Sequence, residues 1–175
     1  MKPYQHILVP VDFTKAFERI GGHGNHRYQH ILVPVDFTKI SNTIVARAHE
    51  LANFYQAKLT LLNVLEDASL GNVAFGGTNK LGMPPAIKQN QINLATEKLR
   101  KLADNLGAGA NVALEVTYAS GKPSDAIIEF VKQNGIELVV VGNSGKKSVL
   151  GFMGSTAEAT LKGVPCDVMA VRIMD

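Results

Sequence analysis

Hydrophobic residues follow two alternating patterns along the chain from residue 28 onward. Short apolar runs rich in β-branched residues, which are typical of buried strands, occupy residues 30–35, 59–65, 112–118, 138–141 and 167–173. Between these runs apolar residues recur at every third or fourth position, which predicts helices. Five strands separated by four helices need crossover connections, so the pattern predicts one parallel, doubly wound α/β sheet.

The predicted helices have sequence signals at their ends. For the helix after the first strand, Thr38 or Ser41 is expected to cap the start. The last helix is expected to begin with a capping box, with Ser155 at the cap and Glu158 three residues on. The remaining helices are expected over residues 87–106 and 123–134, and residues 66–85 are expected to form a long loop.

One twelve-residue segment occurs twice. Residues 4–15 and residues 28–39 both have the sequence YQHILVPVDFTK, and only the second copy continues into a helix. We therefore assign residues 28–175 to the domain and residues 1–27 to an extension, which is either natural or the product of a duplication or cloning artefact. The first copy is expected to add to a sheet edge, to be swapped between subunits, or to form a loosely attached tail.

Composition narrows the class of protein. The chain has 175 residues and a formal net charge of +3, without a run of eighteen apolar residues, so we expect a cytoplasmic protein that has no membrane segment. The chain has no basic block longer than Lys146-Lys147, which argues against nucleic-acid binding. The single cysteine, Cys166, is expected to be a buried, inert thiol.

Two predicted strand ends carry candidate chemistry. The first strand ends in Pro34-Val35-Asp36, and the fourth leads into a segment with Gly142, Gly145 and Gly154. Glycines after a strand let backbone N–H groups approach an anion, and a helix start adds unpaired donors. This arrangement predicts a phosphate cradle, although the same glycines are also compatible with a tight loop that has no ligand.

No set of catalytic or metal-ligating residues is apparent. His30 lies at the start of an apolar strand and is expected to be a structural residue. We therefore expect no catalytic or metal-binding residue.

Four segments taken together resemble the universal stress protein family over nearly all of residues 28–175. They are YQHILVPVDFTKISNTIVARAHELA, LTLLNVLE, GKPSDAIIEF and VVVGNSGKKSVLGFMGSTAEATLKGVPCDVMAVRI. The resemblance implies the adenine nucleotide alpha hydrolase-like fold, with strand order 3-2-1-4-5. It also implies a homodimer that pairs through its last strand, a role in bacterial stress response or signalling, and binding of ATP or AMP. Since no residue is visibly tuned as a general base, we expect at most slow ATP hydrolysis or autophosphorylation.

The resemblance also implies the position of the site. The family's ATP loop has the pattern G-x2-G-x9-G-[ST], whereas eight residues separate Gly145 from Gly154 here. Asp36 and Pro34 are expected beside the base or ribose, Val64 beside adenine, and Mg²⁺ or Mn²⁺ on the phosphates. The full set of expected binding residues is Pro34, Val35, Asp36, Val64, Val141, Gly142, Asn143, Gly145, Lys146, Gly154, Ser155 and Thr156. The alternative function is a dimeric interaction module of the same fold without nucleotide.

Overall fold

The computed structural model describes residues 28–66, 83–107, 111–143 and 154–172. Expectations for residues 1–27, for the loop over residues 67–82, and for Gly145 and Lys146 lie outside these ranges. The elements are β1 (His30–Pro34), α2 (Ser41–Tyr55), β2 (Lys58–Glu66), α4 (Pro85–Asp104), β3 (Val112–Ala119), α5 (Pro123–Gln133), β4 (Leu138–Asn143), α6 (Ser155–Gly163) and β5 (Asp167–Arg172).

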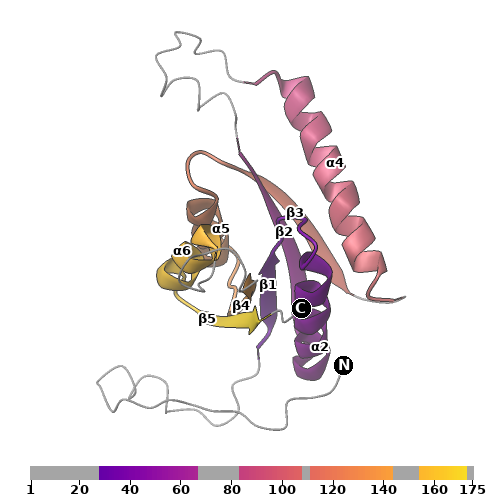
Figure 1. The fold of residues 1–175 in the computed structure, drawn as a ribbon, viewed down its shortest axis with the longest axis vertical. Helices are drawn as coiled ribbons and strands as arrows, with labels where there is room; N and C mark the ends of the chain where they lie inside the picture. Colours follow the sequence, from indigo (N-terminus) through magenta and orange to yellow (C-terminus); the bar gives the residue numbers. More distant parts are fainter. Residues whose placement is uncertain (1–27, 67–82, 108–110, 144–153, 173–175) are drawn as a thin grey trace.

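The five strands form one parallel sheet in the order β3-β2-β1-β4-β5 (Figure 1). The parallel α/β architecture and the strand order are both confirmed. β1 is the central strand, and it pairs with β2 on one side and β4 on the other, with Ile31 opposite both Leu59 and Leu138. The chain therefore moves outward from β1 in two directions, which makes the β1–β4 boundary the topological switch point.

Helices cover both faces of the sheet. α2 and α4 pack on one face, where Ile31 and Val33 of β1 are buried, while α5 and α6 lie on the other face, where Leu32 is buried (Figure 1). Because β1 is enclosed by helices on both faces and by strands on both edges, its fully buried residues Ile31, Leu32 and Val33 must all be apolar. This explains why its sequence is a continuous apolar run rather than an alternating one.

The predicted cap of α2 is wrong. Ile40 occupies the N-cap position, and no side chain caps the helix. The hydroxyl groups of Thr38 and Ser41 donate instead to the Asp36 carboxylate, over 2.8 and 3.2 Å. The Asp36 carboxylate, two residues after β1, therefore accepts hydrogen bonds from the polar groups that were expected to cap the helix.

The predicted capping box of α6 is wrong as well. Gly154 is the N-cap residue, and Ser155 is already inside the helix. The side chain of Glu158 forms an ion pair with Lys162 one turn later, at 2.7 Å, instead of reaching back to the helix start. The first turn of α6 is consequently left without a side-chain cap.

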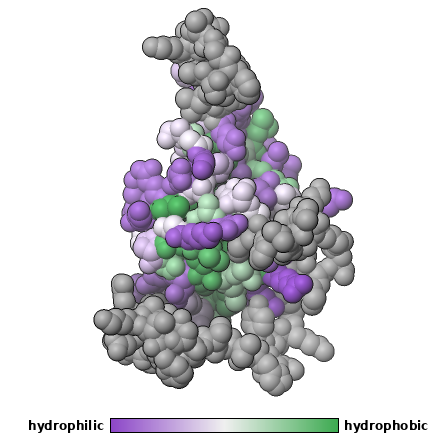
Figure 2. Space-filling model, turned by 60° about the vertical axis from the view of Figure 1, so that its left-hand side comes forward, coloured by the Kyte–Doolittle hydropathy of each residue, from purple (hydrophilic) through white to green (hydrophobic). Residues whose placement is uncertain are grey.

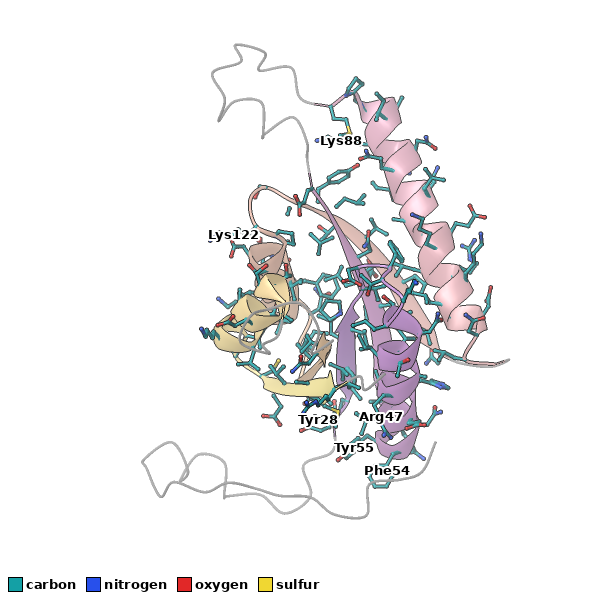
Figure 3. The ribbon with its side chains drawn as sticks, in the orientation of Figure 1. Tyr28, Arg47, Phe54, Tyr55, Lys88 and Lys122 are labelled. Atoms are coloured by element: carbon teal, nitrogen blue, oxygen red, sulfur yellow. The ribbon has the colours of Figure 1, made fainter. Side chains whose placement is uncertain are left out.

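Tyr28, two residues before β1, connects this strand to the rest of the fold at the amino-terminal ends of the strands. The Tyr28 hydroxyl donates to Asp167 at the start of β5 over 2.6 Å, and the Tyr28 ring meets Tyr55 edge to face, with ring centroids 4.9 Å apart. Figure 3 shows Tyr28, Tyr55 and Phe54 together at this end of the molecule. Burial and the bond to Asp167 raise the pKa of Tyr28 above its ordinary value.

Cys166 also lies near this edge, directly before β5, and is partly buried. Burial, with the nearby charge of Asp167, raises the pKa of the Cys166 thiol to about 11. Because the thiolate is the reactive form, the raised pKa disfavours reaction of the thiol at neutral pH, while its burial is only partial and not complete as the sequence analysis expects.

His30 acts as a structural bridge. Its Nδ1 lies 3.1 Å from the Asn134 carbonyl oxygen, which can only accept, so Nδ1 carries the proton. Nε2 then accepts from the Thr60 hydroxyl at 2.8 Å. Burial, followed by the positive charge of Lys58, lowers the pKa of His30, so the neutral ring is the form that the fold stabilises.

The depressed pKa of His30 predicts a loss of stability in mild acid. Below about pH 6.5, the ordinary histidine value, the unfolded chain binds a proton that the folded chain does not bind. The free energy of unfolding should therefore fall as pH decreases through this range, by at most about 1.4 kcal/mol per pH unit from this group. Urea unfolding of the parent and of His30→Gln between pH 5 and pH 8 measures this contribution, with His49→Gln as the control. An unchanged pH dependence in His30→Gln would contradict the assignment.

Candidate functional site

A cavity of about 450 Å³ opens at the carboxyl ends of the central strands. It lies at the topological switch point, where open α/β sheets characteristically bind ligands. The lining residues come from the ends of β1, β2 and β4 and from the starts of α2, α5 and α6. They are Val33, Pro34, Val35, Asp36, Ile40, Ser41, Ile44, Leu62, Asn63, Val64, Glu66, Pro123, Ile127, Val141, Gly142, Gly154, Ser155, Thr156, Ala157 and Thr160.

Asp36 is held rigidly at the mouth of this cavity. Its Oδ1 accepts hydrogen bonds from the backbone N–H of Thr38 at 3.0 Å and from the hydroxyls of Thr38 and Ser41. The turn that allows this needs a left-handed backbone at Phe37, with φ +58°. Within the described part of the chain, no hydrogen bond reaches Oδ2 of Asp36. The fixed, exposed carboxylate therefore retains one oxygen that can accept a hydrogen bond from a ligand.

The start of α6 forms the opposite wall. Ser155, Thr156 and Ala157 make up its first turn, and all three line the cavity. The N–H groups of a first helical turn have no partner within the helix, and Gly154 supplies no capping side chain. These donors, with the partial positive charge of the helix end, favour an anion at this wall.

Two of the predicted glycines differ in their surroundings. A Cβ atom on Gly142 would lie 2.3 Å from Cδ1 of Ile44 and 3.0 Å from Cδ1 of Ile40, whereas a Cβ on Gly154 would meet nothing within 4 Å. Gly142 therefore lets α2 pack closely on β4, while Gly154 leaves open space at the start of α6. Only Gly154 is free of a packing role.

Asn63 is a cavity residue that the sequence analysis missed. It is buried in β2, and its Nδ2 donates to the carbonyl oxygen of Val35 at 2.8 Å. This bond fixes the end of β1 against β2 at the edge of the cavity. The available signal was a single amide side chain in the otherwise apolar run LTLLNVLE, since buried polar groups require a partner.

The structure brings most of the predicted binding residues to this one cavity. Those that line it are Pro34, Val35, Asp36, Val64, Val141, Gly142, Gly154, Ser155 and Thr156. Asn143, which ends β4 and is partly buried, is not among the lining residues. Glu66 and Pro123 line the cavity without having been predicted, because their proximity depends on how β2 and α5 end in three dimensions.

Parallel strand order, helices on both faces and a cavity at the switch point define an α/β domain of the adenine nucleotide alpha hydrolase-like fold. Residues 27–172 match the model of the universal stress protein family, and the chain belongs to that family.

No helix in the described part of the chain is long and apolar enough to span a membrane.

Two curated relatives from Coxiella burnetii are similar over most of the chain. Universal stress protein A homolog 2 is 28% identical over 74% of this chain and 84% of its own length. Universal stress protein A homolog 1 is 30% identical over 75% of this chain and 87% of its own length.

Solved structures are similar as well. The universal stress protein UspA from Lactobacillus plantarum is 27% identical, with a TM-score of 0.64 over 85% of this chain and all of its own. A universal stress protein in complex with cAMP is 24% identical, with a TM-score of 0.58 over 83% of this chain and 98% of its own. The universal stress protein from Archaeoglobus fulgidus in complex with dAMP is 18% identical, with a TM-score of 0.52 over the same shares of the two chains.

The close approach at Gly142 predicts a specific pattern of rescue. Gly142→Ala should destabilise the fold by about 1–3 kcal/mol, the usual cost of overpacking a core, because the new methyl group overlaps Cδ1 of Ile44. Ile44→Val removes that atom, so the double variant should lose less than the two single variants together. Urea unfolding of all four chains measures the coupling, and strict additivity would contradict the steric role.

Proposed function

We propose that this chain binds an adenine nucleotide in the cavity at the carboxyl ends of β1 and β4. The observation that carries the proposal is the polarity of the cavity. The uncapped first turn of α6 forms one wall, and Asp36 and Glu66 lie on the side of β1 and β2. A ligand with an anionic end and a hydroxyl-bearing end matches this separation of charge.

The orientation of the nucleotide follows from the same separation. Phosphate oxygens accept hydrogen bonds from the backbone N–H groups of α6 and from the hydroxyls of Ser155 and Thr156. The ribose hydroxyls donate to the open oxygen of Asp36, and the base lies between Pro34 and Val64. We also assign Asn143, the last residue of β4, and Gly145 and Lys146, which follow it in the sequence, to the phosphate side of the proposed site.

The family supports adenine as the base. One similar universal stress protein has been solved with cAMP and another with dAMP. We extend adenine-nucleotide binding to this chain, with ATP or AMP as the ligand and with Mg²⁺ or Mn²⁺ bridging phosphate oxygens. Chemistry on the ligand is limited to slow ATP hydrolysis or autophosphorylation, and the setting is a cytoplasmic stress response or signalling pathway.

Binding should raise the melting temperature, because a ligand that binds only the folded state stabilises it. ATP, AMP and cAMP are each titrated to millimolar concentration with and without Mg²⁺, and GMP tests the choice of base. Adenine nucleotide released when the purified protein is denatured would be independent support. If the denatured protein releases no adenine nucleotide and no adenine nucleotide shifts the melting temperature, the proposal is contradicted and the interaction module is favoured.

Gly154→Leu should abolish the nucleotide-dependent shift while leaving the ligand-free melting temperature nearly unchanged. A Cβ atom at position 154 would meet no atom of the described residues within 4 Å, so the leucine would extend into the open space at the start of α6. Gly121→Leu is the matched control, because Gly121 also precedes a helix and is not among the residues that line the cavity. A normal shift in Gly154→Leu would exclude the α6 wall as the phosphate site.

We also propose that the chain forms a homodimer through β5, which would serve the nucleotide-binding protein and the alternative interaction module equally. β5 is an edge strand of the sheet, with Ala170 exposed and Val168 and Met169 only partly buried. Figure 2 shows hydrophobic residues gathered on the side of the molecule that carries α5 and α6, with polar residues around them. An unpaired, partly apolar edge of this kind favours pairing with a second copy.

A further inference from the structure

We propose that the β1 position of the sheet is a binding site for residues 4–15 of the same chain, which compete there with residues 28–39. The proposal is independent of nucleotide binding. It rests on two observations: the contacts that define β1 in the structure, and the complete identity of the two twelve-residue segments.

The backbone contacts of β1 fall entirely within the repeated segment. Residues 30–34 pair with residues 58–62 of β2, and Ile31 and Leu32 pair with β4. The ladder is extended by the Val35 N–H, which donates to the Leu62 carbonyl oxygen at 2.8 Å. Residues 4–15 offer the same donors and acceptors, with a proline at the same place, because the order of residues is unchanged.

The side-chain contacts of β1 also fall within the repeat. Ile31, Leu32 and Val33 are essentially fully buried, and Ile7, Leu8 and Val9 are their counterparts in the first copy.

The polar contacts behave in the same way. The bonds of Tyr28 to Asp167, of His30 to Thr60 and of Ser41 to Asp36 each use one residue of the repeat. Tyr4, His6 and Asp12 repeat those residues. The first copy therefore offers the same side chains for each of these contacts.

What separates the two arrangements is the connection to α2. Residues 28–39 lead directly into the helix, since the Ser41 N–H donates to the Thr38 carbonyl oxygen at 3.0 Å. When residues 4–15 occupy the β1 position, residues 16–39 must form a closed loop between Lys15 and Ile40. Closing a loop of about two dozen residues lowers the population by about 100-fold, from (3/2)RT ln n. The other contributions to the free energy of folding cancel, because each arrangement places one copy in the sheet and leaves one identical copy outside it.

The test disables one copy at a time in the full chain. Ile31→Asp places a carboxylate at a fully buried position between β2 and β4, where an unpaired charge is not tolerated. Ile7→Asp is the matched control, and the double variant disables both copies. The folded fraction of the four chains is measured by urea unfolding, with circular dichroism as the signal. Trimethylamine oxide is present throughout to keep weakened chains folded.

Ile7→Asp should behave like the parent, and the double variant should be unfolded. Ile31→Asp should fold, with its folded-to-unfolded ratio about 100-fold below that of the parent and with the elution volume of the parent in gel filtration. These results together would establish that the first copy can form the central strand.

Four outcomes would overturn the proposal. If the Ile31→Asp variant is as unfolded as the double variant, the first copy cannot form β1. A folded double variant would show that folding does not depend on either copy. A clear loss of stability in Ile7→Asp would place residues 4–15 elsewhere, such as at a sheet edge. Folding of Ile31→Asp only in larger, concentration-dependent species would show exchange between chains rather than within one.

Discussion

The structure depends on one constraint, which is the enclosure of β1 on all four sides. β2 and β4 satisfy its backbone groups on both edges, and two separate apolar clusters cover its faces. A buried backbone group without a partner costs as much as a lost hydrogen bond. The central strand therefore fixes the register of both neighbours, and through them the positions of all four described helices.

The same strand determines where ligand chemistry is available. β1 stops at Pro34, the Val35 N–H makes the last ladder bond, and the chain then turns away through the left-handed Phe37. The turn leaves Asp36 exposed at the cavity, with one carboxylate oxygen engaged by Thr38 and Ser41. The end of the central strand thus places a carboxylate in the cavity wall, because Asp36 lies beyond the residues that the enclosure requires to be apolar.

The fold was predictable from the sequence because its signals are local and repeated. Each strand is a compact apolar run, and each described helix has a three-to-four periodicity, so small errors at the ends do not change the architecture. The cap of α2 was not predictable in this way, since the hydroxyls of Thr38 and Ser41 can either cap the helix or donate to the Asp36 carboxylate. Which of the two bonds forms depends on the turn at Phe37, which the composition of the segment does not specify.

The candidate site was predictable in part, and the missing part is tertiary. Most of the predicted residues meet at the cavity because the carboxyl ends of parallel strands lie at one edge of a sheet. Asn63 was missed because its partner, the Val35 carbonyl oxygen, is 28 residues away along the chain. Glycine patterns are ambiguous for the same reason, since the sequence does not distinguish Gly142, which packs on Ile44, from Gly154, which meets open space.

This difference between the two glycines separates stability from ligand binding in the domain. Gly142 joins β4 to α2, so any side chain there disturbs the core and the cavity together. Gly154 borders the cavity, a Cβ atom there would meet no described atom within 4 Å, and its conformation, with φ −59° and ψ 152°, is one that residues other than glycine adopt without strain. No contact among the described residues requires glycine at position 154. A change at this position therefore acts on the cavity wall, where the first turn of α6 favours an anion, without acting on the core.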